Sequence, residues 1–329
     1  MELRTTFPIE PSKDKISYSD PVMFIGSCFA TSIGKKFETG CMPVMINPSG
    51  TVYNPESVLR TLDNIISRRQ FVPDDLYNHD GRWISFDHYT EFSSSDRDEL
   101  LGRINLSNLQ ASEFISGARF LFITFGTARV YRWRQSGNIV SNCHRLPASS
   151  FTNELLGVDH IAGVWSERLS LLKELNPQLK VIFTISPVRH WKDGPHGNQV
   201  SKSVLFLAVE KLLEHPSRPT YFPAYEIVMD DLRDYRYYAD DMLHLTDTAV
   251  DYIWAAFSRC YFDGSTAGLW REVEKISRAV SHRIQSGERD HIRKFSENIL
   301  SKIDRLVSEN PGLDLTKARD YFLGLKDAI

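Results

Sequence analysis

The alternation of short apolar segments with amphipathic stretches constrains the fold of this chain more than any other feature of its sequence. A strand buried on both faces of a parallel sheet gives a short continuous apolar run, whereas a helix that covers the sheet shows apolar residues every three or four positions. The alternation therefore favours β-α units over a β-sandwich, and we expect an α/β domain with a parallel sheet of about five strands between helices. The expected strands are 22–25, 43–46, 120–125, 181–185 and 220–222, and the expected helices lie near 28–38, 54–68, 154–175, 200–214 and 247–262.

Two regions depart from this alternation. Residues 70–118 contain turn signals, a Ser/Asp-rich patch and scattered aromatic residues, so we expect an insertion that covers one edge of the sheet as a loop or closes over the substrate as a lid. From about residue 265, apolar residues recur at helical spacing among mixed charges. We predict a main domain at 1–264 and a helical C-terminal extension at 265–329, which packs on the main domain or joins two copies into a homodimer.

Composition narrows the choice of partners and compartment. The 39 basic and 42 acidic side chains leave a net charge of -3, which favours neither nucleic acid nor an anionic membrane surface as a partner. The four cysteines lie far apart without zinc-site spacing, which is typical of reduced thiols. The N-terminus has no signal-peptide core, and no segment approaches the roughly 20 apolar residues of a membrane-spanning helix. We expect a cytoplasmic protein that uses no cofactor.

The segment VMFIGSCFATSIG, residues 22–34, joins the first expected strand to the first expected helix through a glycine. The side chains after that glycine lie at the carboxyl edge of the sheet, where open α/β folds bind their ligands. Unpaired N–H groups at a helix N-terminus favour both a thiolate and the oxyanion formed on attack. Cys28 gains more from this position than Ser27, which depends on a base to take its proton. The structural alternative makes Ser27 a helix N-cap and Cys28 a small buried residue.

A base for this nucleophile is offered by YYADDMLHLTD, residues 237–247. Asp241 and His244 lie three residues apart just before an expected helix, a spacing that lets the carboxylate accept the Nδ1 proton and turn Nε2 toward the nucleophile. Asp240 is an adjacent competitor for the orienting role. These residues lack a clear further ligand, so we expect no metal site.

Two loops offer donors for an oxyanion. In INPSG, residues 46–50, the N–H of Gly50 and the side chain of Asn47 are candidates. Gly126 and Thr127 follow the third expected strand at the same edge of the sheet.

Four further residues are candidates for binding substrate. Asn142 and His144 follow a short apolar segment, although structural positions in a strand and turn explain them equally well. Arg189 and His190 follow the fourth expected strand. The guanidinium can bind a carboxylate or phosphate of a ligand, or form an ion pair within the protein.

The motif GSCFA at residues 26–30 resembles the motif that names the GSCFA family, and NPSGTVYNP, FGTARVY, NCHRLP, TISPVRH and YFPAYEIV extend the resemblance over most of 20–262. That family is grouped with the SGNH, or GDSL-like, hydrolases. The resemblance implies a flavodoxin-like sheet with a nucleophile after strand one, an oxyanion glycine after strand two, an asparagine after strand three and a DxxH pair near the end.

When the motifs of these hydrolases are matched to this sequence, Gly50 corresponds to the glycine, and Asp241 with His244 corresponds to the DxxH pair. The nucleophile falls on Cys28, or on Ser27 after a shift of one residue. The asparagine falls on Ala128, so Thr127, Asn47 or Asn142 would have to replace it.

The resemblance implies an acyl ester hydrolase or an O-acyltransferase that acts on a small-molecule or carbohydrate ester. The competing hypothesis is a binding module that keeps the sheet and pocket but has lost turnover, because the first motif is altered and the asparagine is absent.

Overall fold

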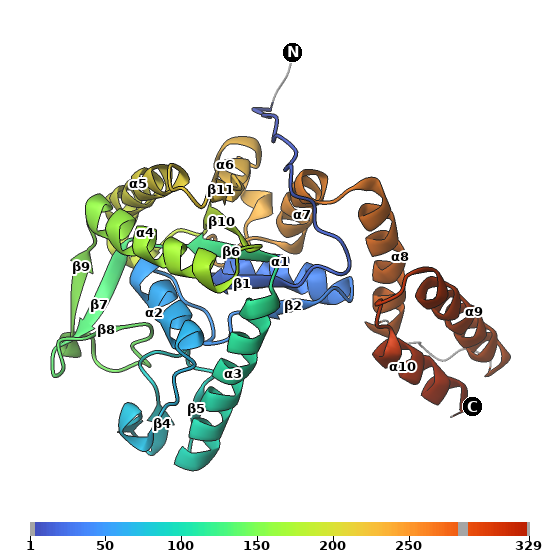
Figure 1. The fold of residues 1–329 in the computed structure, drawn as a ribbon, viewed down its shortest axis with the longest axis horizontal. Coiled ribbons are helices and arrows are strands. Elements are labelled where there is room, and N and C mark those ends of the chain that lie inside the picture. The colour runs from blue at the N-terminus through green and yellow to red at the C-terminus, as the bar shows by residue number, and fades with distance from the viewer. Residues whose placement is uncertain (1–3, 282–288, 328–329) are drawn as a thin grey trace. The chain divides into compact units, whose positions relative to one another are not determined.

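A five-stranded parallel sheet forms the centre of the main unit (Figure 1), in a computed structural model that describes residues 4–281 and 289–327. The sheet order is β11-β10-β6-β1-β2, so the five strands, counted along the chain, run 2-1-3-4-5. This is the flavodoxin-like order, and the predicted fold class is confirmed. All five predicted strands are present, and their bounds are β1 (Val22–Gly26), β2 (Val44–Ile46), β6 (Phe120–Phe125), β10 (Lys180–Ile185) and β11 (Thr220–Tyr221).

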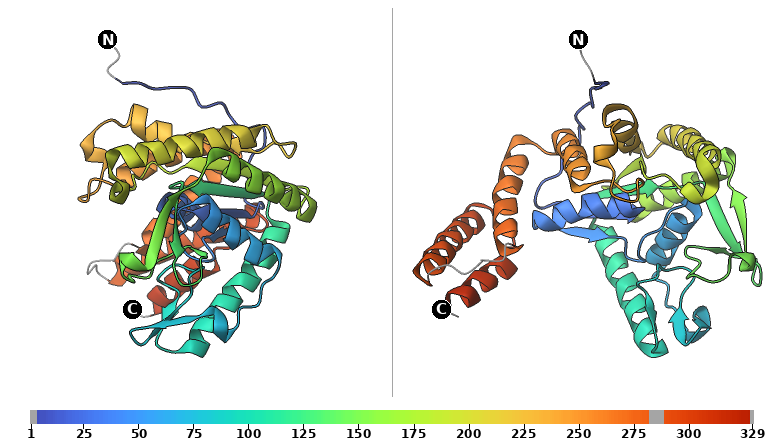
Figure 2. Two further views of the ribbon diagram at one scale, coloured as in Figure 1. Left: turned by 90° about the vertical axis from the view of Figure 1, so that its left-hand side faces the viewer. Right: turned by 180° about the vertical axis from the view of Figure 1, so that it is seen from behind.

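One face of the sheet carries the largest hydrophobic cluster. Met23 and Ile25 of β1 point into it together with alternate residues of β6 and β10, as the two-residue period of a strand requires. Figure 2 shows the sheet from two further sides, with helices packed along it. The helices whose buried side chains join this cluster are α2 (Pro55–Ile66), α3 (Arg97–Gly117), α4 (Val158–Leu175) and α5 (Gly194–Leu213).

The opposite face is covered by α1 (Cys28–Thr39). Phe24 pairs with Ile46 across β1 and β2, so both side chains lie on this second face, where Phe24 also stacks on Phe122 with ring centroids 4.9 Å apart. A Cβ on Gly34 of α1 would lie 2.7 Å from the Ile46 side chain. The missing side chain therefore lets the helix approach the sheet closely, and this contact fixes the direction in which α1 leaves β1.

The insertion is more regular than the sequence indicated. It begins with a small antiparallel sheet and continues into α3, a helix of 21 residues that packs on the main core. Residues 70–118 are therefore largely structured, and the expectation of a loop was wrong for their second half. The strands of the small sheet are β3 (Tyr77–His79), β4 (Arg82–Ile84) and β5 (Ser93–Ser94).

A second antiparallel sheet, which the sequence did not predict, follows β6. Its order is β8-β7-β9, and its strands are β7 (Arg129–Trp133), β8 (Ile139–Val140) and β9 (Phe151–Leu155). The helix expected from residue 154 begins only at Val158, because β9 occupies the preceding residues.

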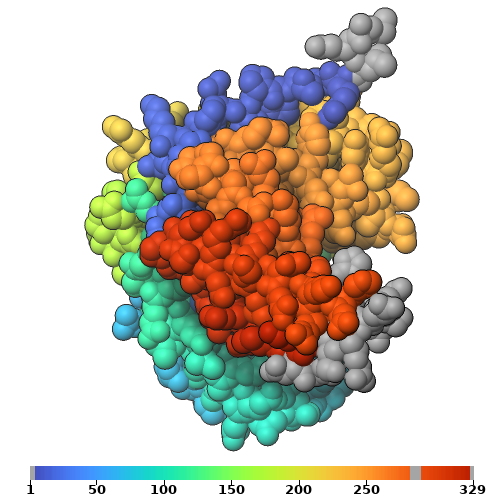
Figure 3. All heavy atoms as spheres, turned by 90° about the vertical axis from the view of Figure 1, so that its right-hand side faces the viewer, coloured from blue at the N-terminus to red at the C-terminus, as the bar shows by residue number. Residues whose placement is uncertain are grey.

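The chain divides into two compact units. The first comprises 1–9, 21–34 and 44–254, and the second comprises 10–20, 35–43 and 255–329. In the second unit, side chains of the C-terminal helices form a hydrophobic cluster of their own. Figure 3 shows the atoms of these segments, in orange and red, packed against one another. The remaining helices are α6 (Ala224–Glu226), α7 (Asp247–Tyr261), α8 (Gly264–Ser281), α9 (Arg289–Glu309) and α10 (Thr316–Asp327).

No helix within residues 4–281 or 289–327 combines the length and the apolar content needed to cross a membrane.

Candidate active site

The turn between β1 and α1 requires a glycine. Gly26 has a φ of 143°, and a Cβ at this position would lie 2.2 Å from the carbonyl oxygen of Thr124 on the neighbouring strand β6. The N–H of Ser27 donates to that same carbonyl at 3.3 Å. The sheet therefore ends at Gly26, and the chain enters α1 without room for another side chain.

Ser27 and Cys28 occupy different environments. Ser27 is 1% exposed, and its buried Oγ has no hydrogen-bond partner among the described residues. Cys28 is the first residue of α1 and only partly buried. The pKa of the Cys28 thiol is raised because burial, the largest cause, outweighs the hydrogen bonds from the N–H groups of Phe29 and Cys28 and the charge of Lys202, which lower that pKa. Of the two candidates, Cys28 is the one that a ligand can reach, and its sulfur faces the N–H groups of the helix N-terminus.

Asn47 fastens the turn that presents these residues. Its Oδ1 accepts the buried N–H of Gly26 at 2.8 Å, and its Nδ2 donates to Oγ1 of Thr31 on α1 at 2.9 Å. Its own N–H donates to the carbonyl of Phe24 at 2.8 Å, and its φ is 44°. The side chain thus links β1, the turn and α1, a bracing role that differs from the oxyanion donor expected from the sequence.

The backbone donors expected for an oxyanion are already bonded. The N–H of Gly50 donates to the carbonyl of Asn47 at 2.7 Å, and the N–H groups of Gly126 and Thr127 donate to the carbonyl of Tyr53 at 2.7 and 3.0 Å. The hydroxyl of Thr127 is buried against Ser201, 2.9 Å away. The helix N-terminus at Cys28 is therefore the better placed donor group.

Asp241 and His244 form the pair that their spacing predicted. Oδ2 of Asp241 lies 2.5 Å from Nδ1 of His244, and its Oδ1 accepts the N–H groups of Leu243 and His244 at 2.9 Å. The bond to the imidazole is the main reason that the pKa of Asp241 falls to about 2. Both side chains are about half exposed, at 49% and 55%.

The charge of Asp241 makes the smallest contribution to the raised pKa of Cys28. Within the described part of the chain, the His244 ring has a hydrogen bond only to Asp241, and none to Ser27 or Cys28.

Lys202 is a site residue that the sequence reasoning missed. It is fully buried in α5, and its Nζ donates to the carbonyls of Gly126 and Ser186, at the carboxyl ends of β6 and β10, at 2.7 and 2.5 Å. Burial lowers the pKa of Lys202 to about 7, and the charge of Cys28 opposes this shift. No carboxylate of the described residues lies within ion-pair distance of Lys202, whose hydrogen-bond partners are the two backbone carbonyls.

The position of Lys202 was readable from the sequence. The buried residues of α5 recur at helical spacing, and the lysine falls on that buried face rather than on the polar one.

Asn142 and His144 have structural contacts. Oδ1 of Asn142 accepts the N–H of His144 at 2.7 Å, and Nε2 of the buried His144 ring lies 2.8 Å from the carbonyl oxygen of Ser85. Burial lowers the pKa of His144, which keeps its ring neutral. Their contacts fasten the loop after β8 to the insertion.

Arg189 and His190 lie beyond the end of β10. The half-buried ring of His190 packs edge-on against Tyr53, with centroids 5.4 Å apart, and burial together with Lys202 and Lys192 lowers its pKa to about 4. Tyr53 in turn interacts with the charge of Cys28. His190 therefore belongs to the surroundings of the thiol.

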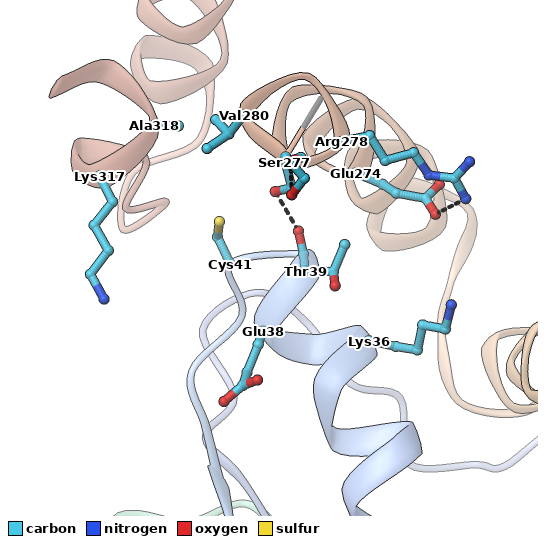
Figure 4. Close-up of a pocket in the computed structure, with 11 residues that line it drawn as sticks. Lys36, Glu38, Thr39, Cys41, Glu274, Ser277, Arg278, Val280, Lys317 and Ala318 are labelled. Atoms are coloured by element: carbon cyan, nitrogen blue, oxygen red, sulfur yellow. Dashed lines mark hydrogen bonds and ion pairs between the residues drawn. The ribbon is translucent and has the colours of Figure 1, made fainter. Parts of the chain in front are cut away.

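A large cavity, about 820 Å³, lies in the second unit and contains none of the predicted site residues. Figure 4 shows Ser277 of α8 facing the end of α1, where its hydroxyl donates to the carbonyl of Thr39 at 2.7 Å, while Cys41 and the cation of Lys317 border the same space. No group of three His, Cys, Asp or Glu side chains suited to a metal ion occurs among residues 4–281 and 289–327.

The fold and site define a flavodoxin-like α/β protein with a thiol at the N-terminus of its first helix. Residues 21–257 match the GSCFA family, and residues 273–324 match the C-terminal domain of GSCFA domain proteins. The chain therefore belongs to the GSCFA family.

Two other comparisons add little. No curated protein matches the chain significantly. Among solved structures, an acetyl xylan esterase from the rumen bacterium Butyrivibrio proteoclasticus is 11% identical, with a TM-score of 0.37 over 78% of this chain. The match spans 66% of the length of that structure's chain.

Proposed function

We propose that this protein transfers acyl groups from esters through a covalent intermediate on Cys28, as an esterase or an O-acyltransferase. The observation that carries the proposal is the placement of Cys28: a reachable thiol at a helix N-terminus, on the carboxyl edge of a parallel sheet, with the charge of Asp241 acting on it. The N–H groups at the helix N-terminus and the charge of Lys202 oppose the rise in the pKa of Cys28 that burial causes, and His244 is needed to take the thiol proton.

Each residue then has a separate role. Cys28 Sγ attacks the ester carbonyl carbon while His244 Nε2 accepts the thiol proton, and Asp241 stabilises the imidazolium. The N–H groups at the start of α1 donate to the oxyanion. His244 returns the proton to the departing alkoxide, which leaves an acyl thioester on Cys28. Water or a hydroxyl group then attacks the thioester while His244 accepts the proton of that nucleophile. The C–S bond breaks, the acid or the new ester leaves, and His244 returns the proton to Cys28 Sγ.

The loop at 239–245 must tighten for this reaction, because the imidazole is half exposed and not bonded to the thiol. Such bonds are often long or absent without substrate and form in the complex.

We assign an acylated carbohydrate as the substrate class. The side chains that interact electrostatically with Cys28 and Arg189 include the partly exposed rings of Tyr53, Tyr225 and Tyr238. Tyrosine rings offer sugar rings both an apolar face and a hydroxyl group.

Hydrolysis of a short-chain nitrophenyl ester tests the proposal. The native protein should release nitrophenol, whereas Cys28→Ala and His244→Gln should fall to the background rate. Ser27→Ala should keep most of the activity because its hydroxyl is buried. Cys143→Ala is the matched thiol control, since burial raises the pKa of Cys143 to about 11 and its thiol is therefore unreactive.

A binding module is the second candidate. The expected oxyanion donors favour this function, because they already form hydrogen bonds within the protein and so do not offer them to an oxyanion. These donors are Asn47, Gly50 and Thr127. Equal background rates in the native protein and all four variants would favour this second function and reject the first.

A further inference from the structure

Arg189 is a half-buried cation without an acidic partner. It lies in the segment after β10, and the contact of its guanidinium is Nη2 to the sulfur of Met229 at 3.7 Å, a weak acceptor. Within residues 4–281 and 289–327, no carboxylate lies within ion-pair distance of it. Some arginines of the main unit are paired: Arg132 lies 3.1 Å from Glu154, and Arg168 lies 2.8 Å from Asp63.

The unpaired guanidinium lies on the same side of the fold as the thiol. Arg189 follows β10 and Cys28 follows β1, and these two strands are separated only by β6. Neighbouring strands are about 4.8 Å apart, so the two strand ends are roughly 10 Å apart at the carboxyl edge. The charge of Arg189 also acts on Lys202 and on Tyr238, which begins the loop that carries His244.

Three basic side chains lie around this edge. Lys202 and Lys192 both act on His190, and Arg189 acts on Lys202. Of the carboxylates around this edge, Asp241 is bonded to His244 and Glu226 accepts the hydroxyl of Tyr221 at 2.9 Å, while Asp230, which acts on Tyr225 as Arg189 does, lies beyond ion-pair distance of Arg189. An anion entering the site would therefore meet a partly desolvated guanidinium with most of its five N–H donors free.

We propose that Arg189 binds a carboxylate of the substrate, so that the acyl ester turned over at Cys28 carries a negative charge. This inference rests on the proposed function for the identity of the reacting group. The anion subsite itself depends only on Arg189 and its surroundings. Two parallel bonds from the planar guanidinium would orient the ester relative to the thiol.

Two esters of matched length test the inference. The 4-nitrophenyl half-ester of glutaric acid carries a terminal carboxylate, and the 4-nitrophenyl ester of pentanoic acid does not. We expect a lower KM for the glutarate half-ester, and Arg189→Gln should raise that KM about tenfold, a much larger change than the one it causes in the KM of the pentanoate ester. Arg132→Gln, which removes a paired and more exposed arginine, is the matched control and should change neither substrate.

A second measurement separates failure of the subsite from failure of the enzyme. Iodoacetate and iodoacetamide alkylate thiols at the same carbon but differ in charge. Peptide mapping gives the rate at which each reagent alkylates Cys28, and we take the iodoacetate rate divided by the iodoacetamide rate. The same ratio measured on N-acetylcysteine is the reference. A ratio several-fold above the reference, which falls in Arg189→Gln, supports the subsite even without ester turnover.

Three results would overturn the inference. The proposed function would still be decided separately, by the nitrophenyl ester assay. The first is an equal KM for the two esters. The second is an equal loss of turnover of both esters in Arg189→Gln. The third, where neither ester turns over, is an alkylation ratio in the native protein no higher than that of N-acetylcysteine. The last result needs only the native protein, so it decides the question even if Arg189→Gln fails to fold.

Discussion

Replacing Asn47 by alanine should destabilise the main unit because one side chain holds three parts of the turn together. The change leaves the buried N–H of Gly26 without its acceptor, at a cost of about 1–3 kcal/mol. Alanine at a φ of 44° adds about 1 kcal/mol, since only glycine and asparagine adopt this conformation readily. We expect a total loss of about 2–4 kcal/mol in the free energy of unfolding, measured by urea titration with tryptophan fluorescence, to which the fully buried Trp165 contributes.

Two companion variants separate the contributions. Asn47→Gly removes the same hydrogen bonds but relieves the backbone strain, so it should be less destabilising than Asn47→Ala by about 1 kcal/mol. Thr31→Val removes only the bond to α1 and should cost about 1 kcal/mol. A loss below about 0.5 kcal/mol in Asn47→Ala would refute the bracing role.

Three further perturbations follow from the same geometry. Gly26→Ala should lose more than about 4 kcal/mol or fail to fold, because its Cβ would meet the Thr124 carbonyl at 2.2 Å; a stable, soluble variant would contradict the assigned turn. Lys202 has a pKa of about 7 in the folded protein and 10.5 in the unfolded chain. Burying its charged form therefore destabilises the fold most below pH 7, and this destabilisation decreases as the pH rises. From pH 7 to 8.5 it should add about 1.5 kcal/mol of stability, a gain that Lys202→Met should lack in urea titrations at the two pH values. Asp241→Asn keeps the acceptor for the N–H groups of Leu243 and His244 but not the charge beside the imidazole, so kcat on a nitrophenyl ester should fall by about 10²- to 10⁴-fold with the fold intact by circular dichroism; an unchanged kcat would remove Asp241 from the mechanism.

The sheet was readable from the sequence because each central strand is a short apolar run buried on both faces. The runs at 22–25 and 120–125 correspond to β1 and β6 to within one residue. Helix α3 was missed because Asn108 and Ser112 interrupt its buried apolar face, which weakens the periodic signal. Strand β9 was missed because Thr152, Asn153 and Glu154 interrupt any apolar run, next to a segment with the periodicity of a helix.

The candidate site was only partly readable for a different reason. The pairing of Asp241 with His244 is local, so a three-residue spacing was enough to predict it. Whether a backbone N–H is free is a tertiary property, and the sequence cannot show that Gly50 already donates to Asn47. Lys202, in contrast, was readable but missed, because a lysine is ordinarily a surface residue and only its position on the buried helix face places it in the interior.

Trapping the acyl-enzyme tests the central claim most directly. A slowly deacylating nitrophenyl ester, quenched in acid, should leave one acyl group on the tryptic peptide of residues 16–35, which contains both Ser27 and Cys28. Fragmentation should place the added mass on Cys28, and Cys28→Ala should abolish it while Ser27→Ala should not. An acyl group on Ser27, or no acyl group on this peptide while ester is consumed, would contradict the account.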